Sequence, residues 1–339
     1  MTPSTQISAS PLEILDIRHF SAAQLRPLLR DEAARWQTRL RWDYTRASNM
    51  LLDYFDSRIL SGFVALHSDS IVGYAFCVFE GAKAVIGDIY AYGETEALSN
   101  PICDLLLHHL LELLYAAPGI DRVESQLLMF PTGALAGPFR ESGFRSAPRL
   151  FMMRNLNLEP ISGAVKIKRH DSSFAVPNLL LQSWQPEFYE SAAALIHRCY
   201  AGHMDADIND QYRTIHGAQR FLHNIIRFPG CGVFDAENSW VLRDPDTLTI
   251  EGILLCSRVR FDVDHITQLC VRPSLQGRGL GQRLLAHCAT QSLERSVKFL
   301  SLTVTEANTA ALHLYQASGF MPVHRFEAMV WDTTFSVSS

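Results

Sequence analysis

Residues 276–281 read Gln276-Gly277-Arg278-Gly279-Leu280-Gly281, with a glycine at every second position. A run typical of a strand, residues 265–271, precedes them, and residues 282–289 have apolar side chains at helical spacing. The glycines therefore lie on a strand-to-helix turn, where backbone N–H groups can converge on one point. The first turn of the helix adds N–H groups that lack an intrahelical partner and the positive end of the helix dipole. This turn predicts a cradle for a phosphate or pyrophosphate group.

The spacing of the glycines indicates which kind of cradle this is. It is neither the dinucleotide fingerprint nor the P-loop, because it has no Gly-Lys-Ser/Thr and no acidic residue placed for a ribose. It matches Gln/Arg-x-x-Gly-x-Gly/Ala, the loop that binds the coenzyme A pyrophosphate in the GNAT acyltransferase superfamily. Residues 305–308 (Thr-Glu-Ala-Asn) and 314–320 (Leu-Tyr-Gln-Ala-Ser-Gly-Phe) resemble the second signature of that superfamily. The chain from about residue 176 to 332 therefore resembles a GNAT domain.

This resemblance implies positions for acetyl-coenzyme A. In GNAT proteins the strand before the loop is splayed from its neighbour, so Leu269 and Val271 would hold the acyl carbonyl and the pantetheine amides. The loop would bind the pyrophosphate, and Asn308 would contact the pantetheine arm. The residues expected to bind the cofactor are Leu269, Cys270, Val271, Gln276, Gly277, Arg278, Gly279, Leu280, Gly281, Gln282, Asn308 and Tyr315.

Transfer of an acyl group from a thioester to an amine needs a proton donor and a base. The leaving thiolate has a reference pKa of about 8.5, so a tyrosine hydroxyl near 10 can protonate it. The resemblance assigns this role of general acid to Tyr315. GNAT proteins often supply the base as a glutamate on one of two strands, but here those strands carry Gln268 and Thr303, and neither is a base. The remaining candidates for the base are Glu306, Asp264 and His265. We expect Glu306 to be catalytic. For His265 the alternative is a position at the edge of a strand, without a catalytic role.

The resemblance to GNAT proteins implies that the acceptor is recognised largely by the first two helices of this half and the loop between them. Asp205, Asp207 and Asp210 would attract a cationic amine. Alternatively the loop is solvated, and Asn209 or Asp210 caps the next helix.

Length and composition favour a globular protein of two domains. The chain has 339 residues, of which 47% are hydrophobic and 19% are charged. The formal net charge of −5 argues against nonspecific binding of nucleic acid. Residues 1–11 lack the apolar core of a signal peptide, and the longest apolar run, 105–117, is too short and too polar to span a bilayer. These features predict a cytoplasmic protein with no membrane partner.

The seven cysteines include no Cys-x-x-Cys pair, which favours reduced, buried thiols. His197, Cys199 and His203 have the residue types of a zinc site, but their spacing fits no zinc pattern, so no metal is expected.

The order of predicted elements is the same in the two halves of the chain: a strand, two helices, three strands, a helix, a strand, a helix and a strand. Residues 139–144 (Phe-Arg-Glu-Ser-Gly-Phe) also align with residues 315–320. The sequence thus predicts an α/β (α+β) protein of two tandem GNAT folds, each a mixed, mostly antiparallel sheet flanked by helices. The domains would be 1–158 and 176–339, joined by a linker, 159–175. This layout is similar to that of the mycothiol synthases.

The first half is expected to be degenerate. Where the second half has its cradle, residues 91–96 read Ala-Tyr-Gly-Glu-Thr-Glu, with one glycine and two carboxylates that would repel a pyrophosphate. Phe139 takes the position of Tyr315 and has no hydroxyl. We therefore expect one coenzyme A site, in the second half.

The resemblance implies an acyl-coenzyme A-dependent N-acyltransferase that acetylates a small-molecule or peptide amine. The alternative is a coenzyme A sensor or scaffold without turnover. Aminoacyl transfer from tRNA also occurs on tandem GNAT-like folds, but it does not need the cradle, and the acidic net charge is unfavourable for it.

Overall fold

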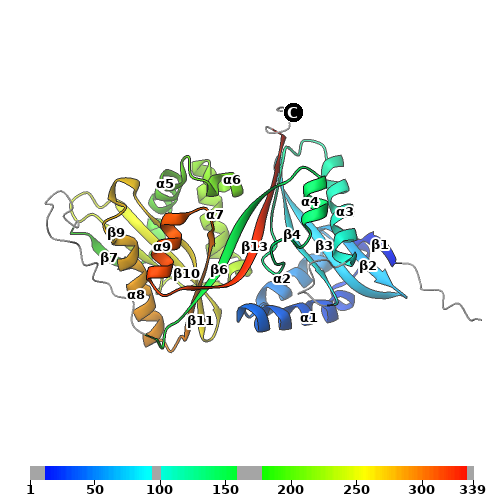
Figure 1. Ribbon diagram of the computed structural model, residues 1–339, viewed down its shortest axis with the longest axis horizontal. Helices are drawn as coiled ribbons and strands as arrows, with labels where there is room; N and C mark the ends of the chain where they lie inside the picture. The colour runs from blue at the N-terminus through cyan, green and yellow to red at the C-terminus, as the bar shows by residue number, and fades with distance from the viewer. Residues whose placement is uncertain (1–11, 94–100, 159–177, 334–339) are drawn as a thin grey trace, which may run out of the picture. The chain divides into compact units, whose positions relative to one another are not determined.

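The computed structural model describes residues 12–93, 101–158 and 178–333. These residues form two compact units (Figure 1). Unit 1 contains the residues up to 35, residues 48–146 and those from 327 on, and unit 2 contains Trp36–Ala47 and Ala147–Phe326. Each unit combines a sheet with helices, so the α/β class predicted from the sequence is confirmed. The predicted linker lies outside the described residues.

The helices and strands follow the order that the sequence predicts, apart from the short α6 and β8, which the second half has in addition. The first half contains β1 (Leu12–Asp16), α1 (Ala22–Leu40), α2 (Thr45–Asp56), β2 (Ser61–His67), β3 (Ser70–Glu80), β4 (Lys83–Ala91), α3 (Pro101–Ala116), β5 (Arg122–Gln126), α4 (Ala136–Glu141) and β6 (Arg145–Asn155). The second half contains β7 (Leu180–Ser183), α5 (Tyr189–Tyr200), α6 (Asp205–Ile208), α7 (Ile215–Arg227), β8 (Val233–Phe234), β9 (Trp240–Arg243), β10 (Ile250–Arg260), β11 (Val263–Val271), α8 (Leu280–Glu294), β12 (Phe299–Thr305), α9 (Thr309–Ala317) and β13 (Met321–Asp332).

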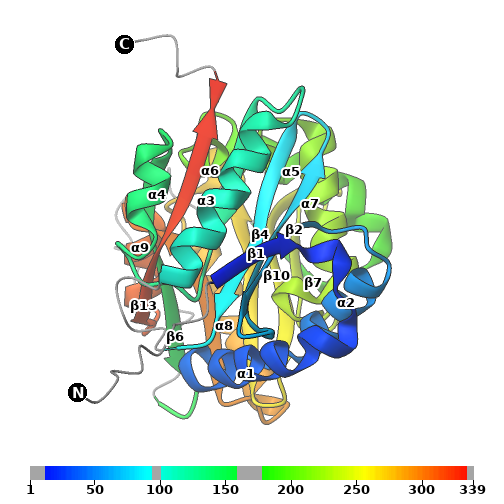
Figure 2. The same ribbon diagram turned by 90° about the vertical axis from the view of Figure 1, so that its right-hand side faces the viewer.

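Each unit has a mostly antiparallel sheet with one parallel pair of strands. In unit 1 the strand order is β1-β2-β3-β4-β5-β13, and β4 and β5 are the parallel pair. In unit 2 the order is β6-β12-β11-β10-β9-β7, with β8 paired to β10, and β11 and β12 are parallel. Helix α3 lies on the sheet of unit 1, where its buried leucines join the core (Figure 2).

The last strand of each sequence half completes the sheet formed mainly by the other half. Strand β6 pairs with β12, with Phe151 opposite Thr303, and β13 pairs with β5, with Ala328 opposite Gln126. The two pairings are equivalent, because the same offset of 177 residues (303 − 126 and 328 − 151) relates one to the other. In these two strands, and in Trp36–Ala47, the compact units differ from the predicted domains 1–158 and 176–339.

The sheet of unit 2 has two different faces, and alternation along each strand decides which side chains belong to which face. The even-numbered residues of β12 join the apolar cluster beneath α8 and α9. Ser301, Thr303 and Thr305 therefore lie on the opposite face, where α5 and α7 pack on β10 and β11. We call this surface the α5/α7 face.

His265 lies in the core of the α5/α7 face. Its ring is 4.8 Å from the ring of Trp42 and 6.0 Å from that of Phe151, measured between centroids, and Nδ1 is 2.9 Å from Ser301 Oγ. Only 4% of its surface is exposed, and this burial lowers its pKa to about 3. His265 is therefore a neutral core residue of a central strand, rather than a catalytic base or a strand-edge histidine.

Most predicted boundaries agree with the structure within a few residues, but β6 and β13 begin earlier than predicted, at Arg145 and Met321, and α7 begins later. The sequence predicts a helix from Gln211, but α7 begins at Ile215 because the Thr214 side chain caps it by accepting from Gly217 N–H (2.9 Å). Asn209 instead caps the short 3-10 turn at residues 210–212. Elements as short as α6 and β8 have no detectable periodicity in the sequence. In the described part of the chain, no helix is both long and apolar enough to cross a membrane.

The stability of the protein should depend on pH through His265. Its pKa is about 6.5 when unfolded and about 3 when folded, so the unfolded chain binds about one more proton between these values. As the pH falls from about 6.5 toward 3, this residue should lower the free energy of unfolding by up to about 1.4 kcal/mol per pH unit. Urea unfolding at pH 7, 6, 5 and 4 gives the free energy of unfolding of the wild type and of His265→Gln as a function of pH. The slope of this free energy against pH should be shallower in the variant, by the amount that corresponds to about one proton. Equal slopes would show that the folded protein accommodates the protonated ring.

Candidate active site

Strands β11 and β12 separate halfway along their length. Their register ends at Ile266 opposite Leu302, although both strands continue beyond these residues. A β-bulge precedes the separation, since β10 pairs with Ile266 and then with Gln268, which leaves Thr267 as the extra residue. A bulge of this kind bends the strand that carries it. The sheet of unit 2 therefore has the splayed pair of strands that the resemblance implies.

Beyond the bulge, alternate residues of β11 direct their backbone groups toward the gap between β11 and β12. Arg272 N–H donates to Glu251 O on β10 (2.8 Å). Because neighbouring residues in an antiparallel ladder alternate, the N–H and C=O groups of Val271 and Leu269 point away from β10. The backbone of Cys270 points toward β10, and its side chain lies in the cluster on the α5/α7 face.

Two side chains fix the end of β11. Gln276 Nε2 donates to Val271 O (3.0 Å), and Cys199 Sγ of α5 donates to the same oxygen (3.4 Å). The thiols of Cys199 and Cys270 share a hydrogen bond that lowers the pKa of Cys199 and raises that of Cys270. The side chains of Gln276 and Cys270, both predicted to contact coenzyme A, thus hold the strand in place.

The glycine-rich turn has the backbone conformation that its sequence predicts. Gly277 and Gly279 have φ of 74° and 77°, a region that glycine adopts without strain. Helix α8 begins directly after Gly279, and its first internal hydrogen bond joins Arg283 N–H to Gly279 O (2.9 Å). The N–H groups of Leu280 and Gly281 therefore precede the helical ladder, at the positive end of the helix.

Gly281 has a packing role that sequence reasoning missed. A Cβ at this position would lie 3.1 Å from Leu314 Cδ2 of α9. The absence of a side chain thus allows α8 and α9 to approach closely, as Figure 1 shows.

The arginines around the turn have protein partners. Arg272 pairs with Glu251 (2.8 Å), Arg283 donates to Leu179 O (3.2 Å) and Arg278 donates to Ser274 O (3.4 Å). Backbone N–H groups are therefore the main donors that the turn offers to an anion.

Tyr315 is buried on the face of the sheet that α8 and α9 cover. Its ring is 8% exposed and packs in the cluster beneath α8 and α9. Burial, and then the charge of Asp205, raise the pKa of Tyr315 above its usual value near 10. Within the described ranges, the structure gives its hydroxyl no hydrogen-bond partner. The hydroxyl is thus protonated at neutral pH, as a proton donor must be.

A polar network lies at the end of β12. Thr305 Oγ1 donates to Asp205 Oδ1 (2.5 Å), and Asp205 Oδ2 is 3.5 Å from His203 Nδ1. Asn308 Oδ1 accepts from Ala311 N–H (3.2 Å) and so caps α9, while Nδ2 of Asn308 is 3.4 Å from His203 Nε2. Asn308 therefore fixes the start of the helix that carries Tyr315, whatever contact it makes with a ligand.

The three predicted acceptor aspartates have different surroundings. Asp205 lies in the network just described, Asp207 pairs with Arg213 (3.2 Å) on the surface, and Asp210 lies in the 3-10 turn before α7. One of the three, Asp205, is close enough to Tyr315 for its charge to raise the pKa of that residue. The residues of the zinc alternative do not converge, and no group of three metal-ligating side chains occurs among the described residues.

The two carboxylates predicted as a base are both held by arginine. Arg325 donates two hydrogen bonds to Glu306 (2.5 and 2.6 Å). Asp264 is fully buried and accepts hydrogen bonds from Asn238 (3.2 Å), Ser292 (2.7 Å) and Arg258. Asp264 is therefore a structural residue, and Glu306 stays a prediction that requires its pair with Arg325 to open.

An aromatic and polar cluster on the α5/α7 face was not predicted from the sequence. Tyr200 stacks on Tyr212 at 4.0 Å between centroids, and its hydroxyl donates to Gln268 Oε1 (3.3 Å). Gln268 is 5% exposed, and its Nε2 has no hydrogen-bond partner. Arg149 of β6 donates to Thr303 Oγ1 (3.5 Å). A role for Gln268 at the site could have been predicted from its position on the strand before the loop. The sequence contains no indication that Arg149 lies there, because β6 belongs to the other sequence half.

Unit 1 repeats the separation of strands without the same side chains. The register of β4 and β5 ends at Ile86 opposite Ser125. Phe139 is buried in α4 at the position that corresponds to Tyr315. The two carboxylates predicted to repel a pyrophosphate, Glu94 and Glu96, lie outside the described residues.

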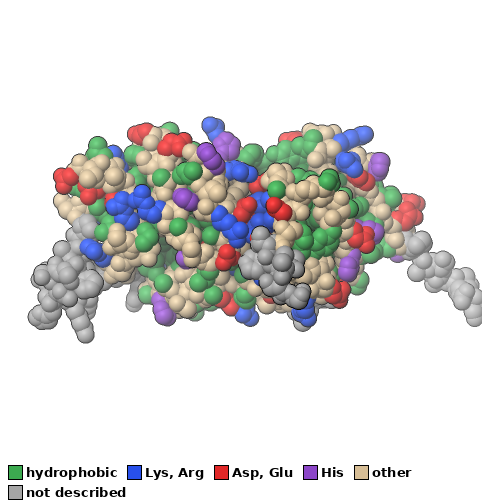
Figure 3. All heavy atoms as spheres, turned by 90° about the horizontal axis from the view of Figure 1, so that it is seen from above, with side chains coloured by type: hydrophobic (Ala, Val, Ile, Leu, Met, Phe, Trp, Pro, Cys, Tyr) green, Lys and Arg blue, Asp and Glu red, His purple; other side chains and the backbone are tan. Residues whose placement is uncertain are grey.

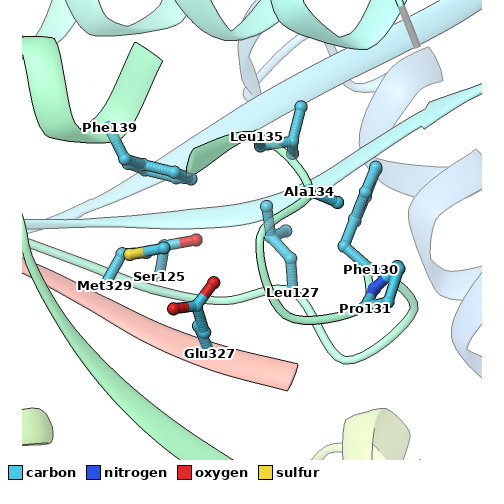
Figure 4. Close-up of a pocket in the computed structure, with 9 residues that line it drawn as sticks. All are labelled: Ser125, Leu127, Phe130, Pro131, Ala134, Leu135, Phe139, Glu327 and Met329. Carbon is cyan, nitrogen blue, oxygen red and sulfur yellow. The ribbon is translucent and has the colours of Figure 1, made fainter. Parts of the chain in front are cut away.

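A small, partly open pocket adjoins Phe139 in unit 1 (Figure 4). Ser125 and Glu327 are its polar lining residues, and most of the others are apolar. The Glu327 carboxylate accepts hydrogen bonds from Gly133 N–H (2.8 Å) and from the Ser146 hydroxyl. Glu327 thus ties the loop before α4 to β13.

Figure 3 shows basic and acidic side chains interspersed over one face of the molecule. A continuous basic surface of the kind that binds nucleic acid is not seen on this face.

Comparisons with known proteins agree with this geometry. Residues 203–320 match the acetyltransferase (GNAT) family, and no curated protein sequence matches the chain. A GCN5-related N-acetyltransferase from Sphaerobacter thermophilus has a similar structure, with a TM-score of 0.65 and 16% identity over 96% of this chain and 97% of that chain.

Two further solved structures have the same fold. A tandem GNAT protein from the clavulanic acid biosynthesis pathway has a TM-score of 0.57 and 13% identity over 95% of this chain and 99% of that chain. A glucosamine N-acetyltransferase region of a fungal multi-domain GH3 β-N-acetylglucosaminidase has a TM-score of 0.62 and 15% identity, over 96% of this chain and 38% of that chain. The predicted fold of two tandem GNAT units is thereby confirmed, and residues 203–320 are the part of the chain that matches the acetyltransferase (GNAT) family.

Proposed function

We propose that unit 2 is an acyl-coenzyme A-dependent N-acyltransferase that transfers an acyl group, acetyl by resemblance, to an amine by direct attack. The observation that supports this most is the separation of β11 and β12 beside the glycine-rich turn. The turn would hold the pyrophosphate of coenzyme A, and Leu269 and Val271 would hold its pantetheine arm and the acyl carbonyl. The N–H groups directed into the gap would stabilise the negative charge that develops on the carbonyl oxygen.

The proposed chemistry divides between the two faces of the sheet. Tyr315 donates a proton to the thiolate as it leaves, and its raised pKa keeps that proton available at neutral pH. The amine approaches from the α5/α7 face, where Asp205 attracts it. An amine with a pKa near 10.4 must lose a proton before attack, and Glu306 can serve as the base only when its pair with Arg325 opens.

A coenzyme A sensor or scaffold without turnover is the second candidate. The observation that favours it is the lack of an open base, since Gln268 and Thr303 occupy the strands on which GNAT proteins often place a glutamate and Glu306 is paired with Arg325.

Calorimetric titration with acetyl-coenzyme A, followed by an amine screen for release of the free thiol, tests the proposal. One site per chain with turnover supports the transferase. One site without turnover on any amine favours the sensor, and no binding excludes both. Two sites per chain would contradict the degeneracy of unit 1.

Gly279→Asp should abolish or strongly weaken binding of acetyl-coenzyme A. Both Asp and its matched control Asn tolerate the positive φ of this position and can cap α8, so the pair differs in charge alone. A negative charge near a pyrophosphate should weaken binding at least about tenfold relative to Gly279→Asn. Equal affinities of the two variants, measured by calorimetry, would remove the turn as the pyrophosphate site. Gly281 is a poorer position for this test, because any side chain there meets Leu314.

Tyr315→Phe should lower kcat by about tenfold or more, with little change in the affinity for acetyl-coenzyme A, because it removes the proton donor and retains the ring. Tyr189→Phe is the control, since it removes the hydroxyl of a half-buried tyrosine, which donates to Gln219 O (2.5 Å), at another place in unit 2. Because the pKa of Tyr315 is raised, the kcat of the wild type should not decline on the alkaline side below about pH 10. A kcat that is unchanged in Tyr315→Phe would eliminate this residue as the general acid.

A further inference from the structure

Opposite charges lie close together on the α5/α7 face. Thr303 and Thr305 are on the same face of β12, about 7 Å apart because they are two residues apart in a strand. Arg149 is opposite Thr305 in the register and donates to the Thr303 hydroxyl (3.5 Å). Asp205 accepts a hydrogen bond from the Thr305 hydroxyl (2.5 Å). A cation and an anion are thus bound to neighbouring threonines.

Gln268 adds a hydrogen-bond donor to the same face. It pairs with Leu255, whose side chain belongs to the cluster under α5 and α7, so the side chain of Gln268 points the same way. Its Oε1 accepts from Tyr200, but its Nε2 is buried with no hydrogen-bond partner. A buried donor without a partner is unfavourable, and an oxygen of a ligand would remove this penalty.

The surroundings of these groups suit a small polar molecule beside an apolar wall. The stacked rings of Tyr200 and Tyr212 form that wall. The charge of Arg149 lowers the pKa values of Tyr212 and Tyr315, against the effect of burial, so its guanidinium lies within electrostatic reach of both the wall and the proposed general acid. Arginine presents a planar set of N–H donors that matches a carboxylate.

We infer that the acceptor is an amine that also carries a carboxylate, such as an amino acid. The carboxylate would be bound by Arg149 and by Nε2 of Gln268, and the amino group would lie toward Asp205. This inference rests on the proposed acyl transfer in unit 2. The amine nitrogen bonds to the acyl carbon and loses a proton, and the carbon–sulfur bond breaks with its electron pair on sulfur. The thiolate takes a proton, and the products are an N-acyl amino acid and coenzyme A.

Matched pairs of acceptors test this substrate class. Each α- and ω-amino acid is compared with its own carboxamide, and kcat/KM is expressed per unprotonated amine because the carboxamide lowers the pKa of the amine. The wild type should prefer the acid to the amide at least tenfold. An equal preference, or a preference for the amides, would overturn the inference.

Two variants assign the preference to residues. Arg149→Met and Gln268→Glu should each lower kcat/KM at least tenfold for the acids and leave the amides within about threefold. Arg149→Met removes the cation. Gln268→Glu keeps the shape of the side chain and an oxygen that accepts from Tyr200, but its negative charge repels a carboxylate. The control is Arg243→Met, which makes the same change of charge on β9. There the guanidinium of Arg243 contacts Gln182 (3.0 Å). Equal losses for acids and amides would assign a structural role to both residues and overturn the inference.

A binding measurement separates this inference from the proposed function. Amino acids and their amides are titrated by calorimetry into the protein saturated with coenzyme A. Selective binding of the acids, lost in Arg149→Met, supports the carboxylate site even if no acyl group is transferred, a result that would overturn the transferase alone. Turnover of amines without any selectivity for the acids would overturn the carboxylate site and leave the transferase intact.

Discussion

The separation of the two central parallel strands is the constraint on which the rest of unit 2 depends. An extra residue, Thr267, enters β11 where its pairing with β12 ends, and the bulge turns the strand away from its neighbour. Unit 1 has the same device, because a register shift leaves Gly87 as the extra residue of β4, directly after the last pair with β5. A side chain at Gly87 would overlap the ring of Phe76. Both units thus bend the same strand at the same place, and the bend is a property of the fold.

What differs between the units is the set of side chains around the bend. Unit 2 has a turn with two left-handed glycines after β11, and it has Tyr315, which lies within electrostatic reach of Asp205. In unit 1 the corresponding helix carries Phe139, which cannot donate a proton, and the adjacent pocket is organised by structural hydrogen bonds of Glu327. A shared backbone with different side chains explains why the fold is repeated although the proposed chemistry is assigned to one unit.

The sequence predicts features that depend on local backbone chemistry and misses those that depend on distant segments. The conformation of the glycine-rich turn and the start of α8 could be predicted because glycine and helix termini act locally. The exchange of β6 and β13 could not, because the alternation of apolar residues is satisfied equally by pairing with β12 or with β5. His265 was misread for the same reason, since the rings of Trp42 and Phe151 that bury it come from the first sequence half. The base was uncertain because the partner of Glu306, Arg325, lies on another strand.

The strand exchange makes the first half necessary to the site of the second. Strand β6 covers β12 from Phe299 to Thr305, so without it this edge of the sheet would present unpaired N–H and C=O groups. The same strand supplies Arg149, which contacts Thr303, and the backbone carbonyl of Pro148, which accepts from Glu306 N–H (2.9 Å). The first half therefore contributes both sheet pairing and a cation to the proposed acceptor site. This contribution would require no coenzyme A binding in unit 1.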